Sequence, residues 1–407
     1  MMKISKIQAL SLAIATVTAG YSTGASASSL SYALNNGKTT GDVRLRYESV
    51  KQDNALDDAS ALTMRTRLGY TTGGYNGFSA TLEFEDSRIV GGVDEFSVPQ
   101  TSFNTGEASV VLDPEVTEVD QAFVKYSNGG FSGKYGRQVL TFDNHRFIGH
   151  VGWRQDRQTF DGLTLKYSPT KAVSLNYGYI SKRNRIFAEA KDLQSKDHLF
   201  NASYNTAYGK LVGYAYLLET DNDTDNALDT FGVSFDGKTK IGGLGVLYRV
   251  EAASQKSEVG DSEFDTQYML VEGGVNVSGI TLKLGYEQLG SDSGDAGFAT
   301  PLATLHKFNG WSDQFAASTP TAGLVDAYAV ASTSVGPGKA TLIWHEFSAD
   351  ESTATVDDLG SELNLVYSMK FGGAYNAGVK YAAYTAGDEA AGKVDTDKLW
   401  VWVGAKF

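Results

Sequence analysis

The stretch Val43-Arg44-Leu45-Arg46-Tyr47-Glu48 places an apolar residue and a charged one at alternate positions. Successive side chains of a β-strand point to opposite faces of the sheet, so this pattern predicts a strand with one apolar and one charged face. Residues 62–70 repeat the pattern, with Arg65 and Arg67 on the charged side. The two stretches predict a sheet that separates an apolar environment from a polar one.

The same alternation recurs to the end of the chain and predicts about eighteen strands, with sixteen as the alternative count. They lie at residues 40–50, 61–70, 78–86, 118–127, 131–140, 158–167, 173–181, 197–205, 210–219, 227–237, 243–255, 264–277, 280–290, 323–334, 339–349, 358–371, 375–385 and 395–407. Their lengths are close to the roughly 9–11 residues with which a tilted strand crosses a membrane. The 22 Tyr, 20 Phe and 45 Gly fit β-structure with aromatic surfaces and tight turns.

The connections between these strands alternate in length. Short turns occur at residues 128–130, 168–170, 278–279, 336–338 and 372–373, and long segments at residues 87–117, 141–157, 182–196, 291–322 and 386–394. All six prolines fall in connections, as expected when the strands are fully paired. Short turns on one side of a membrane and long loops on the other are typical of outer-membrane proteins. The sequence therefore predicts an all-β fold, a single transmembrane antiparallel up-and-down β-barrel, with loops 87–117, 141–157 and 291–322 turned into its lumen.

Residues 1–27 have the pattern of a cleavable secretory signal peptide. Lys3 and Lys6 form a basic region, residues 7–20 an apolar region and residues 25–27 a cleavage site of small residues. The apolar region is too short for a permanent membrane anchor. We therefore expect residues 28–407 to form the barrel, located in the outer membrane of a Gram-negative bacterium and crossing it many times.

The composition excludes several classes of protein. The chain has 35 Lys and Arg against 48 Asp and Glu, a net charge of −13, which argues against a nucleic-acid partner. It has no cysteine, so disulfides and thiolate metal sites are excluded. Beyond the signal peptide no apolar stretch reaches the roughly 18 residues of a transmembrane helix.

The sequence contains no complete catalytic or metal-binding motif. Its one Gly-x-Ser-x-Gly lies at residues 20–24, inside the signal peptide, and the pair His345-Glu346 lacks the second histidine of a zinc motif. The acidic run at residues 221–226 begins like a calcium loop but lacks the glycine and the bidentate glutamate that complete one. We expect no enzymatic activity, no cofactor and no metal site.

Arginines gather on the strand faces and loops that should line the lumen. They are Arg44, Arg46, Arg65, Arg67, Arg137, Arg146, Arg154, Arg157, Arg183, Arg185 and Arg249, with Asp143 beside them in the loop 141–157. Arginine keeps its charge and binds carboxylate or phosphate through a planar fork, so a row of arginines in a narrow passage would attract anions. The alternative is that these residues are the ordinary polar face of a barrel, paired with acidic neighbours. The pattern leaves both interpretations open.

The chain ends with an alternating strand, residues 398–407, in which Leu399, Val401, Val403, Ala405 and Phe407 share one face. A terminal phenylalanine on such a strand resembles the signal by which the outer-membrane assembly machinery recognises its substrates. The alternative is an ordinary amphipathic last strand.

Three segments resemble the alginate-export family of outer-membrane barrels. They are Tyr135-Gly136-Arg137-Gln138, Asp143-Asn144-His145-Arg146-Phe147 and residues 151–161, and residues 305–315 and 319–328 support them. The resemblance covers about 50 residues and implies an eighteen-stranded barrel whose loops and inward arginines form a selective constriction. Arg137, Arg146, Arg154 and Arg157 stand at the matching motif positions.

These observations together predict a porin for the passive diffusion of small hydrophilic solutes, with a bias towards anions. An alternative is a channel for an anionic, alginate-like polysaccharide, and a barrel that only carries an adhesin or enzyme is a further one. Phe308 and Trp311 could stack on sugar rings or could anchor a loop folded into the lumen. We expect the lipid bilayer, lipopolysaccharide and the assembly machinery as partners, and a monomer or a homotrimer.

Overall fold

The computed structural model describes residues 27–224, 226–316 and 318–407. The expected signal peptide therefore lies outside the described residues, apart from Ala27. A short helix, α2 (Ala27–Asn35), precedes the first strand, an element that the period-two analysis does not foresee. It is tied to the first turn, where the Gly73 amide donates to the Ala33 carbonyl at 2.9 Å. No helix in the described part of the chain has the length and apolarity needed to cross a membrane.

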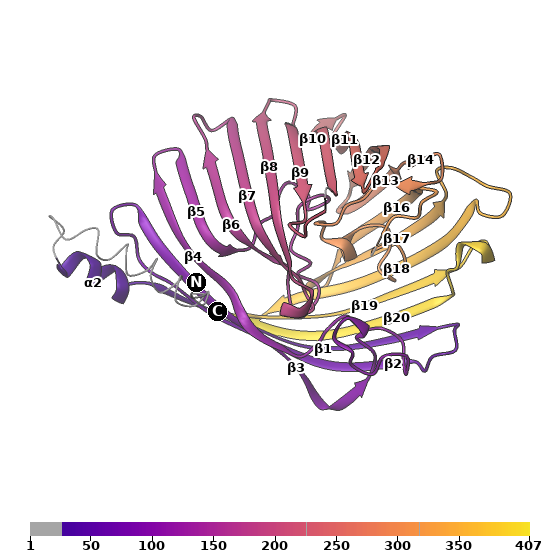
Figure 1. The fold of residues 1–407 in the computed structure, drawn as a ribbon, viewed down its shortest axis with the longest axis horizontal. Helices are drawn as coiled ribbons and strands as arrows, with labels where there is room; N and C mark the ends of the chain where they lie inside the picture. The colour runs from indigo at the N-terminus through magenta and orange to yellow at the C-terminus, as the bar shows by residue number, and fades with distance from the viewer. Residues whose placement is uncertain (1–26, 225, 317) are drawn as a thin grey trace.

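Eighteen long strands form one sheet in which each strand is antiparallel to its neighbours. They are β1 (Lys38–Gln52), β2 (Ala59–Thr71), β3 (Phe78–Glu95), β4 (Val116–Asn128), β5 (Phe131–Gln138), β6 (Thr159–Tyr167), β7 (Val173–Asn184), β8 (Leu193–Asn205), β9 (Lys210–Glu219), β10 (Ala227–Ile241), β11 (Leu244–Val259), β12 (Ser262–Val277), β13 (Ile280–Leu289), β16 (Leu324–Val335), β17 (Gly338–Ser348), β18 (Asp358–Phe371), β19 (Tyr375–Thr385) and β20 (Thr396–Lys406). Each pairs with the next along the chain (Figure 1). The expected eighteen strands are confirmed.

The last strand closes the sheet against the first. β20 pairs with β1 from Asp42↔Lys406 to Gln52↔Thr396. The first alternating stretch of the sequence, residues 43–48, therefore lies beside the last one, residues 399–405. The Gly41 amide donates to the Phe407 carbonyl at 2.9 Å, and the Phe407 amide donates back to the Gly41 carbonyl at 3.0 Å. Closure leaves no unpaired sheet edge, which a strand inside a membrane could not tolerate.

Each strand has an apolar outer face and a polar inner one. Leu284 on β13 and Leu68 on β2 are 70% and 54% exposed, while Arg46 and Glu85 on the inner face are fully buried. On β20, Leu399, Val401 and Val403 point outwards as the sequence predicts. An exposed apolar band around a polar interior is the arrangement that lipid imposes on a barrel.

The expected end of the third strand, residue 86, is wrong, because β3 continues to Glu95. Residues 87–95 lack a clean alternation, and Gly91 and Gly92 both have φ of +67°, so the strand is irregular there. Beyond Gly91 and Gly92 the strand rejoins β2 at the pair Ser60↔Glu95. A search for alternating residues does not detect this segment as a strand, because the irregular backbone at the two glycines changes which face of the sheet the following residues occupy.

Short turns connect the strands at one end of the barrel and longer loops at the other. The loops contain the short hairpin β14 (Ser291–Asp292) and β15 (Ala296–Gly297) and four single-turn 3-10 helices, η1 (Pro99–Thr101), η2 (Glu189–Lys191), η3 (Leu305–Lys307) and η4 (Glu389–Ala391). Loops after β3, β5 and β13 turn inwards, and Figure 1 shows chain segments within the space that the strands enclose. Their apolar residues, such as Phe147 and Phe298, pack against inward aromatics of the wall, so the apolar core lies inside the barrel.

Candidate functional site

Two loops meet inside the barrel and narrow it. We call residues 139–158 the inner loop and residues 290–323 the second inner loop. The Gly149 amide donates to the Leu302 carbonyl at 2.7 Å, and the Thr304 amide donates to the His145 carbonyl at 2.9 Å. These backbone hydrogen bonds join the loops into one partition between the ends of the channel.

Arg154, on the inner loop, connects this partition to the wall. Its Nη1 lies 2.9 Å from Glu48 Oε2 on β1, and its Nη2 lies 3.0 Å from Asp313 Oδ2 on the second inner loop. The side chain is 3% exposed. Burial alone would lower the pKa of Arg154, but Glu48, Asp113 and Asp313 raise it above its usual value, so the guanidinium stays charged.

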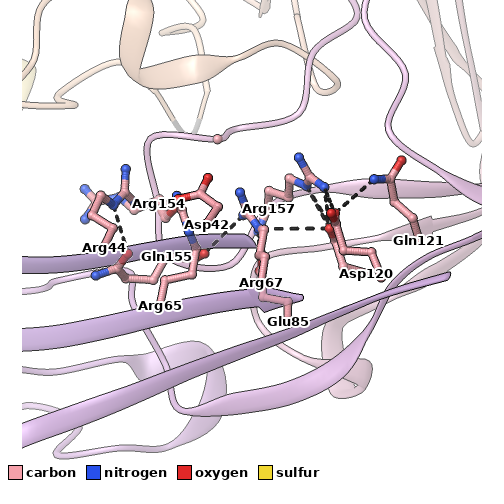
Figure 2. A network of polar contacts seen from close by, with 12 residues as sticks. Asp42, Arg44, Arg65, Arg67, Glu85, Asp120, Gln121, Arg154, Gln155 and Arg157 are labelled. Atoms are coloured by element: carbon pink, nitrogen blue, oxygen red, sulfur yellow. Dashed lines mark hydrogen bonds and ion pairs between the residues drawn. The ribbon is translucent and has the colours of Figure 1, made fainter. Parts of the chain in front are cut away.

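Arg157, three residues further on, makes a second connection to the wall. Its Nε lies 3.0 Å from Asp120 Oδ1, and its Nη2 lies 2.5 Å from Glu83 Oε1. Arg67 on β2 pairs with Glu85, and Figure 2 shows Arg67 and Arg157 side by side, with Asp120 beyond them. The charges of Arg67 and Arg157 are thus compensated by carboxylates of the wall.

Arg44, by contrast, has no carboxylate partner in the part of the chain that the structure describes. Its guanidinium donates to Gln155 Oε1 at 3.1 Å and to the carbonyls of Trp153 and Arg154 at 2.7 and 2.8 Å (Figure 2). The neighbouring Arg46 is fully buried and pairs with Asp113 and Glu48. Arg44 therefore holds the inner loop while keeping an uncompensated charge.

Arg65 is only partly bonded. Its Nη2 lies 2.8 Å from Asp42 Oδ1, but its Nε and Nη1 are buried and have no hydrogen-bond partner. Asp42 is shared with Lys406, whose Nζ lies 3.0 Å away. Arg65 thus brings a second guanidinium group beside Arg44, with its charge shared with Asp42.

These arginines line a cavity of about 240 Å³ on the short-turn side of the inner loop. Five of its eleven lining residues are basic and one is acidic. They are Asp42, Arg44, Arg65, Arg67, His150, Gly152, Arg157, Asn376, Trp402, Gly404 and Lys406, and we call this cavity the arginine pocket. Burial and the charge of Arg157 lower the pKa of His150 to about 4, so the pocket's imidazole is neutral at pH 7. The pocket is a small cationic chamber suited to an anion.

The other expected site residues lie outside the arginine pocket. Arg137 pairs with Asp161 at 2.8 Å, and Arg146 pairs with Glu287 at 2.8 Å. Asp143 accepts from Lys210 at 2.7 Å. In the same way Arg183 pairs with Asp197 and Arg249 with Glu251. All of these residues are paired with opposite charges, Arg137, Arg183 and Arg249 on the barrel wall and Asp143 and Arg146 on the inner loop.

The two loop aromatics already stack on cations of the protein itself. Arg146 lies over the Phe308 ring at 4.8 Å, and Lys380 lies over the Trp311 ring at 3.7 Å. Trp311 is 9% exposed. The arrangement favours an anchoring role over a sugar-stacking one, because the faces used for stacking are covered.

A row of buried, hydrogen-bonded polar side chains near Trp311 was not predicted from the sequence as part of the site. Lys380 Nζ lies 2.7 Å from His306 Nε2, and His306 Nδ1 lies 2.8 Å from Asp313 Oδ1. Burial alone would raise the pKa of Asp313, but His306, Lys398 and Arg154 lower it below its usual value. The available signal was that Lys380 and Lys398 occupy inward positions of strands 375–385 and 395–407, where a lysine needs a partner.

Comparison with known proteins agrees with this geometry. The family model described as alginate export matches residues 37–298. No curated protein matches the chain.

Solved structures with the same fold are outer-membrane proteins. OpdK of Pseudomonas aeruginosa, solved with vanillate, superposes with a TM-score of 0.72 at 13% identity, over 92% of this chain and 99% of that one. OccAB4 of Acinetobacter baumannii gives 0.70 at 14% identity, over 91% and 98%. OccD3 of Pseudomonas aeruginosa gives 0.68 at 12% identity, over 92% of both chains. These likenesses show the closed barrel fold, and the family match over most of the chain shows that this protein belongs to the alginate export family.

Proposed function

We propose that this chain is an outer-membrane porin for the passive diffusion of small hydrophilic solutes, with a preference for anions. The observation that carries the proposal is the arginine pocket, where five of eleven lining residues are basic and Arg44 has no carboxylate partner among the described residues. A solute carboxylate in the pocket would compensate the charge of Arg44 while the ion pairs of the wall stay in place. Field lines focused in a narrow, low-dielectric passage would raise the local concentration of anions.

Size supports a small solute over a polymer. The arginine pocket, at about 240 Å³, is below the roughly 300–1,000 Å³ typical of sites for drug-sized ligands. The partition above it is held on both sides, since Arg154 bonds to the wall and to the second inner loop. The vanillate in the OpdK structure is a carboxylate of a size that fits this proposal.

Membership of the alginate export family favours a second candidate, a conduit for an anionic polysaccharide. It would require the partition of the two inner loops to move aside, because a polymer needs a continuous track. A chain of uronic acids would then meet the same arginines one after another.

One experiment separates the two candidates. The purified, signal-cleaved protein in a planar bilayer would be measured for conductance and for reversal potential in a salt gradient. We expect steady ohmic conductance, an anion-selective reversal potential and a decrease in current on adding vanillate. Block by uronic-acid oligomers with no effect of vanillate would instead favour the polysaccharide conduit, and a lack of conductance would contradict both.

We also propose that the protein lies in the outer membrane of a Gram-negative bacterium, after cleavage of residues 1–27, with its longer loops facing lipopolysaccharide. The export pattern and the exposed apolar band support this location. The short turns would then face the periplasm, and the arginine pocket would open towards that side.

Phe407 offers a test of the assembly step. Its side chain is 70% exposed, so replacing it should leave the folded barrel almost unchanged in stability. We expect Phe407→Ala to lower the amount of folded protein in the outer membrane, while refolding in detergent proceeds as in the wild type. Outward-facing Leu284→Ala, also on a 70% exposed side chain, is the matched control. Equal membrane levels of all three proteins would contradict a recognition role.

A further inference from the structure

Buried oxygen atoms without hydrogen-bond partners gather where the inner loop meets β4, β6 and β7. Both carboxylate oxygens of Asp156 have no partner, and the residue is fully buried. Glu118 Oε1 and Thr159 Oγ1 are likewise buried and unpaired. Asn184 Oδ1 is the fifth such atom, and its orientation is fixed because the amide Nδ2 donates to Asp161 Oδ1 at 2.9 Å.

Strand pairing brings these residues together. The Arg157 amide donates to Glu85 Oε1 at 3.2 Å, which places the inner loop beside Glu85, and Glu85 is directly opposite Glu118 in the β3–β4 ladder. Directly opposite residues of a ladder point to the same face. Among charged groups, Asp156 has the largest electrostatic effect on Glu118.

The hydroxyl oxygen of Thr159 and the amide oxygen of Asn184 lie at the other end of the inner loop, on β6 and β7. Thr159 follows Asp156 by three residues and is directly opposite Asn184 in the β6–β7 ladder. Both side chains are buried, with exposures of 0% and 1%. The five unpaired oxygens thus belong to four side chains that chain adjacency and strand pairing bring to one region of the lumen, which we call the corner.

Among the described residues, no basic side chain forms an ion pair with Asp156 or Glu118. The acidic neighbours of this corner are already paired, Asp120 with Arg157 and Asp192 with Lys182. Asp156 and Glu118 therefore leave an excess of two negative charges without a basic partner.

The nearby donors are occupied elsewhere. Arg67 pairs with Glu85, and Arg137 pairs with Asp161. The Arg157 amide donates to Glu85 Oε1 at 3.2 Å and is therefore shared between that carboxylate and the adjacent Asp156. Among the described residues, Asp156 and Glu118 have no ion-pair partner and no side-chain hydrogen bond at these atoms.

An ionised carboxylate buried in this way is strongly unfavourable unless it gains a counter-ion or a proton. Asp156 is 0% exposed, so water cannot take the place of the missing partner of its carboxylate. A set made only of carboxylate, amide and hydroxyl oxygens is the donor set that hard divalent cations use.

We propose that Asp156 and Glu118, with Thr159 and Asn184, form a site for a divalent cation of the Ca²⁺ class that fastens the inner loop to the barrel wall. Ca²⁺ accepts six to eight oxygen ligands in flexible geometry and would neutralise the excess of two charges. Within the described residues no group of three or more acidic, histidine or cysteine side chains is placed to hold a metal, so this site rests on two carboxylates. Water would complete the coordination, and affinity would be modest, with Kd about 10⁻⁴–10⁻³ M.

The test uses the purified, folded full chain in detergent, with Ca²⁺ as the probe in calorimetric titration and thermal unfolding. We expect one bound Ca²⁺ in the wild type and a rise in Tm on adding it. Asp156→Asn should weaken Ca²⁺ binding by roughly tenfold or more and remove the rise in Tm. Glu118→Gln, which changes the wall instead of the loop, should act in the same way.

Asp223→Asn is the matched control, because Asp223 lies in the exposed acidic run of the loop 220–226 and its replacement removes the same charge. We expect it to bind Ca²⁺ as the wild type does. Binding by Asp156→Asn and Glu118→Gln equal to that of the wild type, or no binding by the folded wild type, would overturn the proposal. The titration needs no conductance, so its outcome is separate from that of the porin proposal.

Discussion

Replacing Arg154 by alanine is expected to release the inner loop and to raise the single-channel conductance severalfold. The substitution removes the only basic partner bridging Glu48 on β1 and Asp313 on the second inner loop among the contacts described. Removing one partner of a buried ion pair costs up to about 3–5 kcal/mol, and here the cost is reduced because Glu48 keeps Arg46 and Asp313 keeps His306 and Lys398. The loss falls on the contact that joins the inner loop to the wall, so we expect the population of open arrangements of the partition to rise.

Single-channel recordings would measure this effect, together with the temperature at which the barrel unfolds in detergent gels. Arg88→Ala is the matched control: Arg88 also pairs with a carboxylate, Asp86, but its side chain is 44% exposed. An exposed pair contributes about 0.2–1 kcal/mol, so the control should conduct like the wild type. If Arg154→Ala folds and keeps the wild-type conductance, the two inner loops are not the partition that limits the current.

Neutralising both Arg44 and Arg65 as glutamine is expected to remove most of the anion preference and the block by vanillate. A hydrogen bond to a charged group contributes about 1.5–3 kcal/mol, so the loss of each such bond should weaken carboxylate binding roughly 10- to 100-fold. Asp42 keeps Lys406 as its partner in the double variant, which limits the damage to the wall. Reversal potential in a salt gradient and the concentration of half-maximal block are the readouts.

The control is Arg183→Gln together with Arg249→Gln, which removes two lumen arginines that do not line the arginine pocket. We expect this protein to retain the block by vanillate. An equal loss of block in both double variants would mean that the overall lumen charge, and not the arginine pocket, sets the preference. Arg154 and Arg157, at the matching family positions, are the less informative targets for selectivity because their charges are paired inside the protein.

The strands of the barrel could be predicted from the sequence because one physical rule governs every strand of a membrane barrel. Residues such as Leu45 and Arg46 alternate since one side meets lipid and the other water, and the rule uses only neighbours along the chain. It fails where the backbone departs from period two, as at Gly91 and Gly92 in β3, and where the element is helical, as in α2.

The sequence also identified which arginines face inwards, but it did not separate the available ones from the compensated ones. Arg44 and Arg46 occupy equivalent positions two residues apart on one strand, yet Arg46 pairs with Glu48 and Asp113 while Arg44 bonds to uncharged groups. That difference depends on residues from other strands and from the inner loop, at sequence separations that no local pattern contains.

By itself, then, the sequence determined a closed barrel of eighteen strands with charged residues turned inwards, because lipid on one face and water on the other constrain every residue locally. Only the tertiary structure decided that Arg44 has no carboxylate partner among the described residues, that Arg154 joins the inner loop to Glu48 and Asp313, and that Asp156 is buried without an ion-pair partner there. The physical reason is that the free energy of a buried charge depends on which partners lie beside it in space. Many of these partners lie on loops, and no periodic pattern in the sequence predicts the conformation of a loop.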